Sequence, residues 1–150
     1  MRTTQQLELG DARNMATAAQ QAADNQVDAN GPARVSIAVV DGGGHLLLLE
    51  RRDGASVASV ETAIAKARMA ALNGKATADQ EAAINSERPA LLQLSTIFGQ
   101  PAVAMGGGIP LRSGADCIGA IGVSGMTPQI DLAIAAAGAA RFADLEQQQR

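Results

Sequence analysis

The sequence predicts an α+β domain in which helices flank a central antiparallel β-sheet. Three observations carry this prediction. Apolar residues recur at three- and four-residue steps near the start, the middle and the end of the chain, which is the spacing of a helical face. Two β-rich runs joined by a glycine turn follow the first helical segment, as in a β-hairpin. A chain of 150 residues is long enough for one domain and short for two, so a single domain is expected over residues 1–150.

The first helix is expected from Asp11 to Asn25, because its alanines share one face. The Asn-Gly-Pro sequence at 30–32 then forms a turn. Val35–Val40 and His45–Arg51 are the two strands of the hairpin, and the segment Asp41-Gly-Gly-Gly44 connects them.

A second helix is expected from about Ser56 to Leu72, with the Asn73-Gly74 pair as its terminator. Thr77 is then expected to cap a short third helix. Pro89 breaks the stretch that follows, which is mostly irregular with a helical turn near Leu91.

The last third of the chain predicts two further strands and a closing helix. The strands are expected at Ala102–Met105 and Cys117–Val123, with a glycine-rich corner, GGGIPL, at 106–111. The helix begins at Pro128, which suits a first helical position, and ends near Ala143. The tail at 145–150 is expected to be frayed. Together these elements complete a sheet covered by helices.

The composition limits the partners of the protein. Phe98 and Phe142 are the only aromatic residues, so the apolar fraction of 47% consists mainly of small and aliphatic side chains. Such side chains bury little area each, which favours a homo-oligomer. The net charge is −3 and basic residues form no block, which argues against nucleic-acid binding.

The remaining compositional features favour a cytoplasmic protein. Cys117 is the only cysteine, which excludes an intrachain disulfide. The first residues lack the apolar run of a secretory signal, and no apolar stretch reaches the length of a membrane span. No membrane partner is therefore expected.

His45 is the only histidine, which excludes metal sites that need two or more imidazoles. A single axial bond to a haem or cobalt centre remains open to it. The alternative is an ordinary polar residue at the start of a strand.

Two glycine-rich segments are candidate binding loops. In IGAIGVSGMTPQ, at 118–129, Ser124 and Thr127 precede a helix whose free N–H groups would attract an anion. The alternative is that the glycines allow close backbone packing, with Ser124 and Thr127 bonding locally. In GGGIPL, Gly107, Gly108 and Pro110 either turn the sheet or let a flat ligand approach the main chain.

Basic residues at two places are candidates for contact with carboxylates. Lys66 lies among alanines on the second predicted helix, and Arg51, Arg52 and Asp53 follow the hairpin. Each basic side chain either lines a pocket or is simply solvated.

Four blocks occur together in a specific order: VSIAVVDGGGHLLLLERRDGA, ASVETAIAKARMAA, GGGIPL and IGAIGVSG. On these blocks the chain resembles the GlcG/HbpS-like family, whose domains also form the C-terminal part of PduO-type proteins. The resemblance covers nearly the whole chain. It implies a profilin-like α/β sandwich, self-assembly from dimers up to octamers, and in some members binding of haem or a corrinoid.

The leading prediction is a protein that binds a small ligand, haem or another tetrapyrrole, in an oligomeric assembly. His45 would be the axial metal ligand, with Arg52 and Lys66 as carboxylate partners. Together with the helix-start argument for Thr127, the resemblance gives the candidate ligand-binding residues His45, Arg52, Asp53, Lys66, Gly107, Gly108, Pro110, Ser124 and Thr127.

Two alternatives remain open for the function. The first is an enzyme of small-molecule catabolism, in which Lys66, Asp53 or His45 acts as general base on an acidic or amide-containing metabolite held at Ser124–Thr127. The second is an accessory protein of a catabolic operon, which needs no site.

Overall fold

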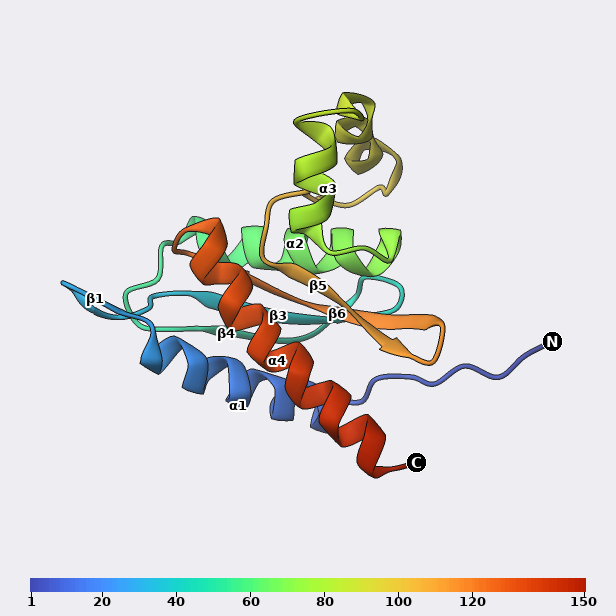
Figure 1. Cartoon of the computed structure of the whole chain (residues 1–150), viewed down its shortest axis with the longest axis horizontal. Coiled ribbons are helices and arrows are strands. Elements are labelled where there is room, and N and C mark those ends of the chain that lie inside the picture. Colours follow the sequence, from blue (N-terminus) through green and yellow to red (C-terminus); the bar gives the residue numbers. More distant parts are fainter.

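A four-stranded antiparallel sheet in the order β4-β3-β6-β5 forms the centre of the computed structural model, which describes residues 1–150. Helices cover both faces of this sheet (Figure 1). The predicted α+β class is therefore confirmed. The strands are β3 (Ser36–Asp41), β4 (Leu46–Arg51), β5 (Gly108–Ser113) and β6 (Asp116–Ser124).

The two faces of the sheet have different cores. Helices α1 (Leu9–Asn25) and α4 (Pro128–Gln148) lie against each other on one face, and α2 (Ala58–Asn73) lies on the other (Figure 1). The α1–α4 side encloses the larger side chains, Met15 and Ile134 among them. The α2 side is built mainly of alanines, whose small side chains let the helix lie close to the strands.

Gly122 shows how close this approach is. A Cβ atom at this position in β6 would collide with the carbonyl of Ala63 and lie 2.6 Å from the backbone nitrogen of Ala67, both on α2. The absence of a side chain therefore lets the helix backbone contact the strand backbone.

Local signals placed most elements correctly. The first helix, both hairpin strands, the second helix with its cap at Gly74, and the strand β6 match their predicted segments within a few residues. Thr127 caps α4 as expected, because its side-chain oxygen accepts a hydrogen bond of 3.3 Å from the N–H of Ile130.

Three local predictions are wrong. Ala102–Met105 forms no strand; the edge strand β5 begins at Gly108, inside the predicted corner, because Gly108 pairs with Gly122. Thr77 is the first residue of α3 (Thr77–Ile84) and not its cap, since its hydroxyl accepts from the N–H of Gly108 at 2.8 Å. Helix α4 continues to Gln148, so most of the tail is helical and not frayed.

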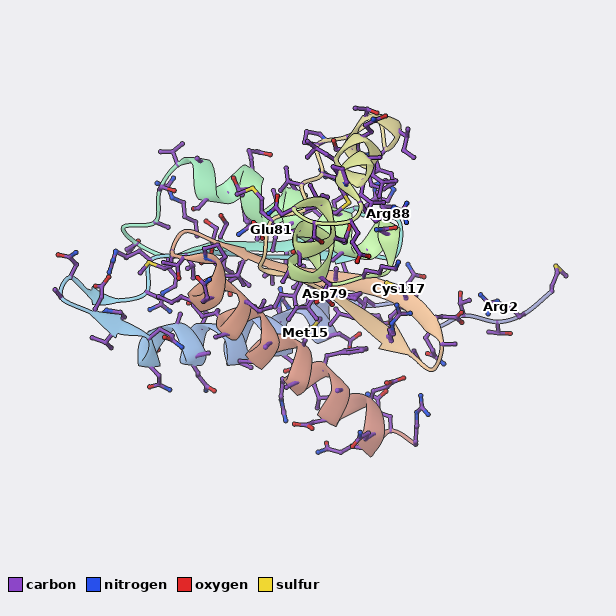
Figure 2. All side chains as sticks on the ribbon, turned by 45° about the horizontal axis from the view of Figure 1, so that its top comes forward. Arg2, Met15, Asp79, Glu81, Arg88 and Cys117 are labelled. Atoms are coloured by element: carbon purple, nitrogen blue, oxygen red, sulfur yellow. The ribbon has the colours of Figure 1, made fainter.

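An arm made of α3 and the 3-10 helix η1 (Pro89–Ile97) projects from the body (Figure 1), and Figure 2 shows Glu81 and Arg88 on it. None of the η1 residues is buried, although the segment is largely apolar. Leu92 is 65% exposed and Ile97 is 72% exposed. The arm thus presents apolar surface that the rest of the chain does not cover.

A short hairpin of β1 (Val27–Asp28) and β2 (Gly31–Pro32) follows α1; its turn lies at Ala29–Asn30, one residue before the predicted turn at 30–32, and Gly31 and Pro32 form the second strand. None of the helices has the length and apolar character together that crossing a bilayer demands.

The close approach of α2 and β6 predicts that adding a methyl group at Gly122 destabilises the fold. Gly122→Ala should lower the free energy of unfolding by about 3 kcal/mol, because the added carbon meets backbone that cannot move aside. Urea denaturation measures this difference. Gly10→Ala on α1 is the matched control, since a Cβ there has open space; it should be neutral or stabilising by about 0.5 kcal/mol. Equal effects of the two variants would contradict the packing described here.

Candidate functional site

Lys66 and Asp131 form an ion pair inside the protein, between the two helix layers. Lys66 is on α2 and Asp131 is in the first turns of α4, and each is 2% exposed. The Lys66 Nζ lies 3.2 Å from Asp131 Oδ2 and donates a second hydrogen bond of 3.0 Å to the carbonyl of Val123, near the end of β6. Lys66 therefore connects α2, β6 and α4.

The start of α4 binds a carboxylate of the protein itself, that of Asp131. Asp131 Oδ1 accepts a hydrogen bond of 2.9 Å from the N–H of Met126, while Thr127 caps the helix. Burial raises the pKa of the Asp131 carboxyl above its ordinary value, against the opposing effects of the Met126 N–H and the Lys66 ammonium. The N–H groups of Met126 and Ile130, at the helix start where an external anion was expected, thus already have acceptors within the chain.

The glycine corner packs around the same ion pair. A Cβ atom at Gly107 would collide with the carbonyl of Val123 and lie 3.1 Å from Lys66 Nζ. Gly108 is similarly close to the backbone of Lys66. Gly107 therefore leaves room for the lysine side chain, and Gly108 lets β5 approach the backbone of α2.

The remaining predicted residues of this region have structural neighbours. Ser124 is buried at the end of β6 and pairs with Ser36 in the sheet, and Pro110 lies half-buried in the edge strand β5. Proline is tolerated there because an edge strand leaves some of its N–H groups unpaired.

Arg52 and Asp53 lie after β4, apart from the ion pair. The Arg52 guanidinium donates to Asp24 Oδ1 at 2.6 Å and to the carbonyl of Ala33 at 2.9 Å, which ties the end of α1 to the hairpin. Asp53 is exposed and lines a shallow depression with Arg34, Arg52 and other residues. The charge of Arg52 is therefore already compensated within the chain.

His45 is exposed in the turn between β3 and β4, and its imidazole lies beside Gly43 without a hydrogen bond or ion pair. Its backbone N–H donates to Asp41 Oδ1 at 3.0 Å, which holds the turn. Gly44 takes a φ of +80°, a conformation that favours glycine. Of the predicted residues, His45 alone offers an exposed imidazole nitrogen without a hydrogen-bond partner, while Asp53 offers an exposed carboxylate.

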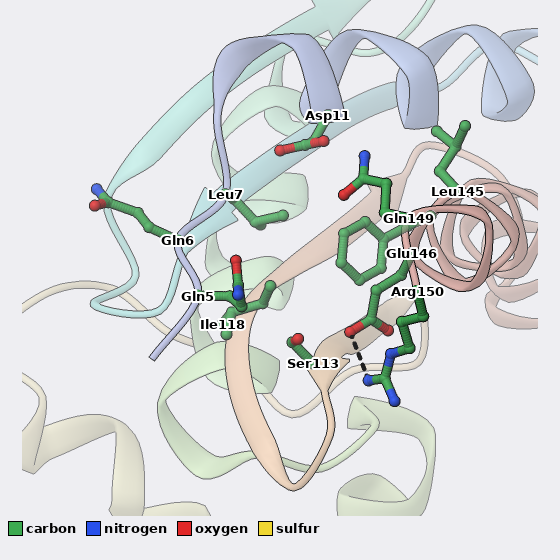
Figure 3. Close-up of a pocket in the computed structure, with 11 residues that line it drawn as sticks. Gln5, Gln6, Leu7, Asp11, Ser113, Ile118, Leu145, Glu146, Gln149 and Arg150 are labelled. Atoms are coloured by element: carbon green, nitrogen blue, oxygen red, sulfur yellow. Dashed lines mark hydrogen bonds and ion pairs between the residues drawn. The ribbon is translucent and has the colours of Figure 1, made fainter. Parts of the chain in front are cut away.

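A partly enclosed pocket of about 190 Å³ lies elsewhere, between the N-terminal segment, the β5–β6 turn and the end of α4 (Figure 3). Phe142 lines it together with Glu146, whose pKa is lowered by hydrogen bonds from Ser113 and Arg150. None of the nine predicted residues lines this pocket. Groups of three or more His, Cys, Asp and Glu side chains suited to a metal ion do not occur.

Sequence reasoning missed Asp131. An acidic residue in the first turns of an otherwise apolar helix was the available signal, together with a lysine surrounded by alanines on α2. Neither signal identifies the partner, which lies 65 residues away along the chain.

The comparisons with known proteins agree with the fold and with the residue blocks. The model of the family described as "Haem degrading protein HbpS-like" matches residues 7–140. The chain belongs to the HbpS-like family. The predicted family resemblance is thereby confirmed.

Individual relatives of this HbpS-like chain extend the comparison. It is 38% identical over 90 residues to protein GlcG of Escherichia coli K12; this match spans 60% of the chain and 63% of GlcG. The crystal structure of Klebsiella pneumoniae protein ORFY matches with a TM-score of 0.81 at 31% identity, covering 95% of this chain and 97% of ORFY. The structure of a PduOC–haem complex matches with a TM-score of 0.77 at 27% identity, covering 91% and 95%.

Within this HbpS-like fold, the predicted residues fall into separate places. Lys66 and Asp131 are internal, Arg52 is at one end of the hairpin strand β4, and His45 is at the other end. His45 and Lys66 line neither the pocket at Phe142 nor the surface depressions beside Asp116, Asp53 and Ser95. Within one copy of the chain, neither Arg52 nor Lys66 therefore lies next to the imidazole of His45.

The ion pair predicts strong coupling between its two members. Asp131→Asn keeps an oxygen for the Met126 N–H but removes the counter-charge of Lys66, which should lower the free energy of unfolding by about 3–5 kcal/mol. In urea denaturation, the double variant Lys66→Met/Asp131→Asn should be more stable than Asp131→Asn alone. If the loss of unfolding free energy in the double variant equals the sum of the losses in the two single variants, the two side chains do not interact.

The pKa of Asp131 predicts a pH-dependent defect in Lys66→Met. Without the ammonium, burial should raise the pKa of the Asp131 carboxyl further above its value in the unfolded chain. When the pKa of the Asp131 carboxyl is higher in the folded chain than in the unfolded chain, the protonated carboxyl stabilises the fold at low pH. This stabilisation is lost as the pH rises through the folded-state pKa, where the buried carboxyl must ionise. The variant should therefore lose more stability relative to wild type at about pH 7.5 than at about pH 5. The same loss at both values would contradict this account.

Proposed function

We propose that this HbpS-like protein binds haem, or a related tetrapyrrole, at the exposed turn that carries His45. The observation that carries the proposal is the uncommitted state of this imidazole, the only one in the chain. A neutral imidazole nitrogen is a common axial ligand of haem iron, and it would serve the cobalt of a corrinoid equally. The fold of the PduOC–haem complex and the family description support the choice of ligand.

The surface around His45 suits a flat apolar ligand on one side. Leu46, the next residue, is 46% exposed. Leu72 of α2 packs against Gly44 and is also exposed, at 37%. These aliphatic side chains would contact a porphyrin face in place of the aromatic residues that the chain lacks.

We further propose that binding takes place in a homo-oligomer. A single chain covers only one side of a ligand at an exposed turn, so a second copy would be needed to enclose it. The uncovered apolar residues of the α3–η1 arm, such as Leu92 and Ile97, support self-association.

An enzyme of small-molecule catabolism is the second candidate, and it has less support. The Asp131 carboxylate takes the Met126 N–H group at the helix start where an acidic metabolite was expected. Lys66, the proposed base, is bonded to the same carboxylate. His45 and Asp53 remain as exposed candidates for a general base.

Titration with hemin tests the proposed function. The wild-type protein should sharpen and shift the Soret band at saturation, and His45→Ala should weaken hemin binding by at least about 100-fold because the axial bond is lost. Met105→Leu and Cys117→Ala are matched controls, since each removes another side chain able to bind iron without altering the turn. A sharp band that survives His45→Ala, or a wild-type spectrum of unbound hemin, would overturn the proposal.

A further inference from the structure

Arg68 lies next to the His45 turn, on the face of α2 that packs against it. Its Nε donates a hydrogen bond of 3.2 Å to the carbonyl of Gly44, the residue before His45. Its Nη1 donates a hydrogen bond of 2.6 Å to the carbonyl of Pro101, after the α3–η1 arm. The guanidinium is therefore one peptide unit from the proposed metal ligand.

The charge of Arg68 has no carboxylate partner. Both of its acceptors are neutral carbonyls, and Arg68 forms no ion pair. By contrast, Arg52 is bonded to Asp24 and Lys66 to Asp131. A guanidinium has five N–H donors, and the two hydrogen bonds to carbonyls leave others free.

The glycine of the turn makes this proximity compatible with the fold. A Cβ atom at Gly44 would lie 2.9 Å from the Cγ of Arg68, so a larger residue would push the arginine stem away from the turn. Leu72, one helical turn later on α2, contacts the same glycine and gives the neighbouring surface its apolar character.

We infer that Arg68 is the carboxylate partner of the tetrapyrrole bound at His45, in place of Arg52 and Lys66. This inference rests on the proposed function. Haem carries its carboxylates at one edge and its metal at the centre, so the cation that binds them must stand beside the imidazole and not beneath it. Arg68 meets this requirement because it comes from a neighbouring element and keeps donors free for a charge-assisted hydrogen bond.

Comparing hemin with its dimethyl ester tests the inference, because the ester has the same ring and metal without the carboxylate charges. Arg68→Gln should weaken hemin binding about tenfold and leave binding of the ester unchanged within about twofold. Arg68→Lys, which keeps the charge, should retain much of the preference for hemin over the ester. Arg141→Gln, an exposed arginine on α4 across the sheet, is the control for net charge and should affect neither ligand.

The outcomes separate this inference from the proposed function. If Arg68→Gln weakens both ligands equally, the arginine only clamps the turn to the loop after the arm, and the inference is wrong. If it weakens neither ligand, the inference is wrong as well. If wild-type protein binds neither ligand, or if binding does not depend on His45, the proposed function is wrong, and the inference is then wrong too. Thermal unfolding of each variant confirms that it is folded.

Discussion

The buried ion pair between Lys66 and Asp131 is the constraint on which the rest of the structure depends. Two charges removed from water are tolerated only where hydrogen bonds satisfy their remaining donors and acceptors. The carbonyl of Val123 and the N–H of Met126 supply these bonds, which fixes the end of β6 and the start of α4 around α2. The ion pair also requires glycine at position 107, because any side chain there would displace the lysine.

The same constraint determines where a ligand can bind. Alanines and glycines bring α2 against the sheet, so the interior on that side is filled by backbone and by the protein's own charges. The proposed binding chemistry therefore lies at the surface, where the His45 side chain is exposed and the apolar arm near Leu92 is uncovered. In this account the family fold supplies a rigid frame, and the exposed turn supplies the chemistry.

Local signals explain what the sequence could predict. Thr127 before Pro128 marks a helix start by short-range hydrogen bonding, and the glycine turn marks the hairpin, so both were placed correctly. The edge strand was misplaced because Gly108 and Pro110 locally disfavour a strand, and only their pairing with β6 overrides that preference. The ion pair of Lys66 could not be predicted either, because its partner Asp131 is distant in the sequence.

The single histidine allows the central claim to be tested with one label. In protein grown with ¹⁵N-histidine, only His45 carries the isotope, so a pulsed electron paramagnetic resonance spectrum of the ferric hemin complex reports directly on that imidazole. A strong hyperfine coupling between the iron and a directly bonded ¹⁵N nucleus is the result expected here. A complex that forms without this coupling would show that the iron is held by another residue and that the exposed turn is not the binding site.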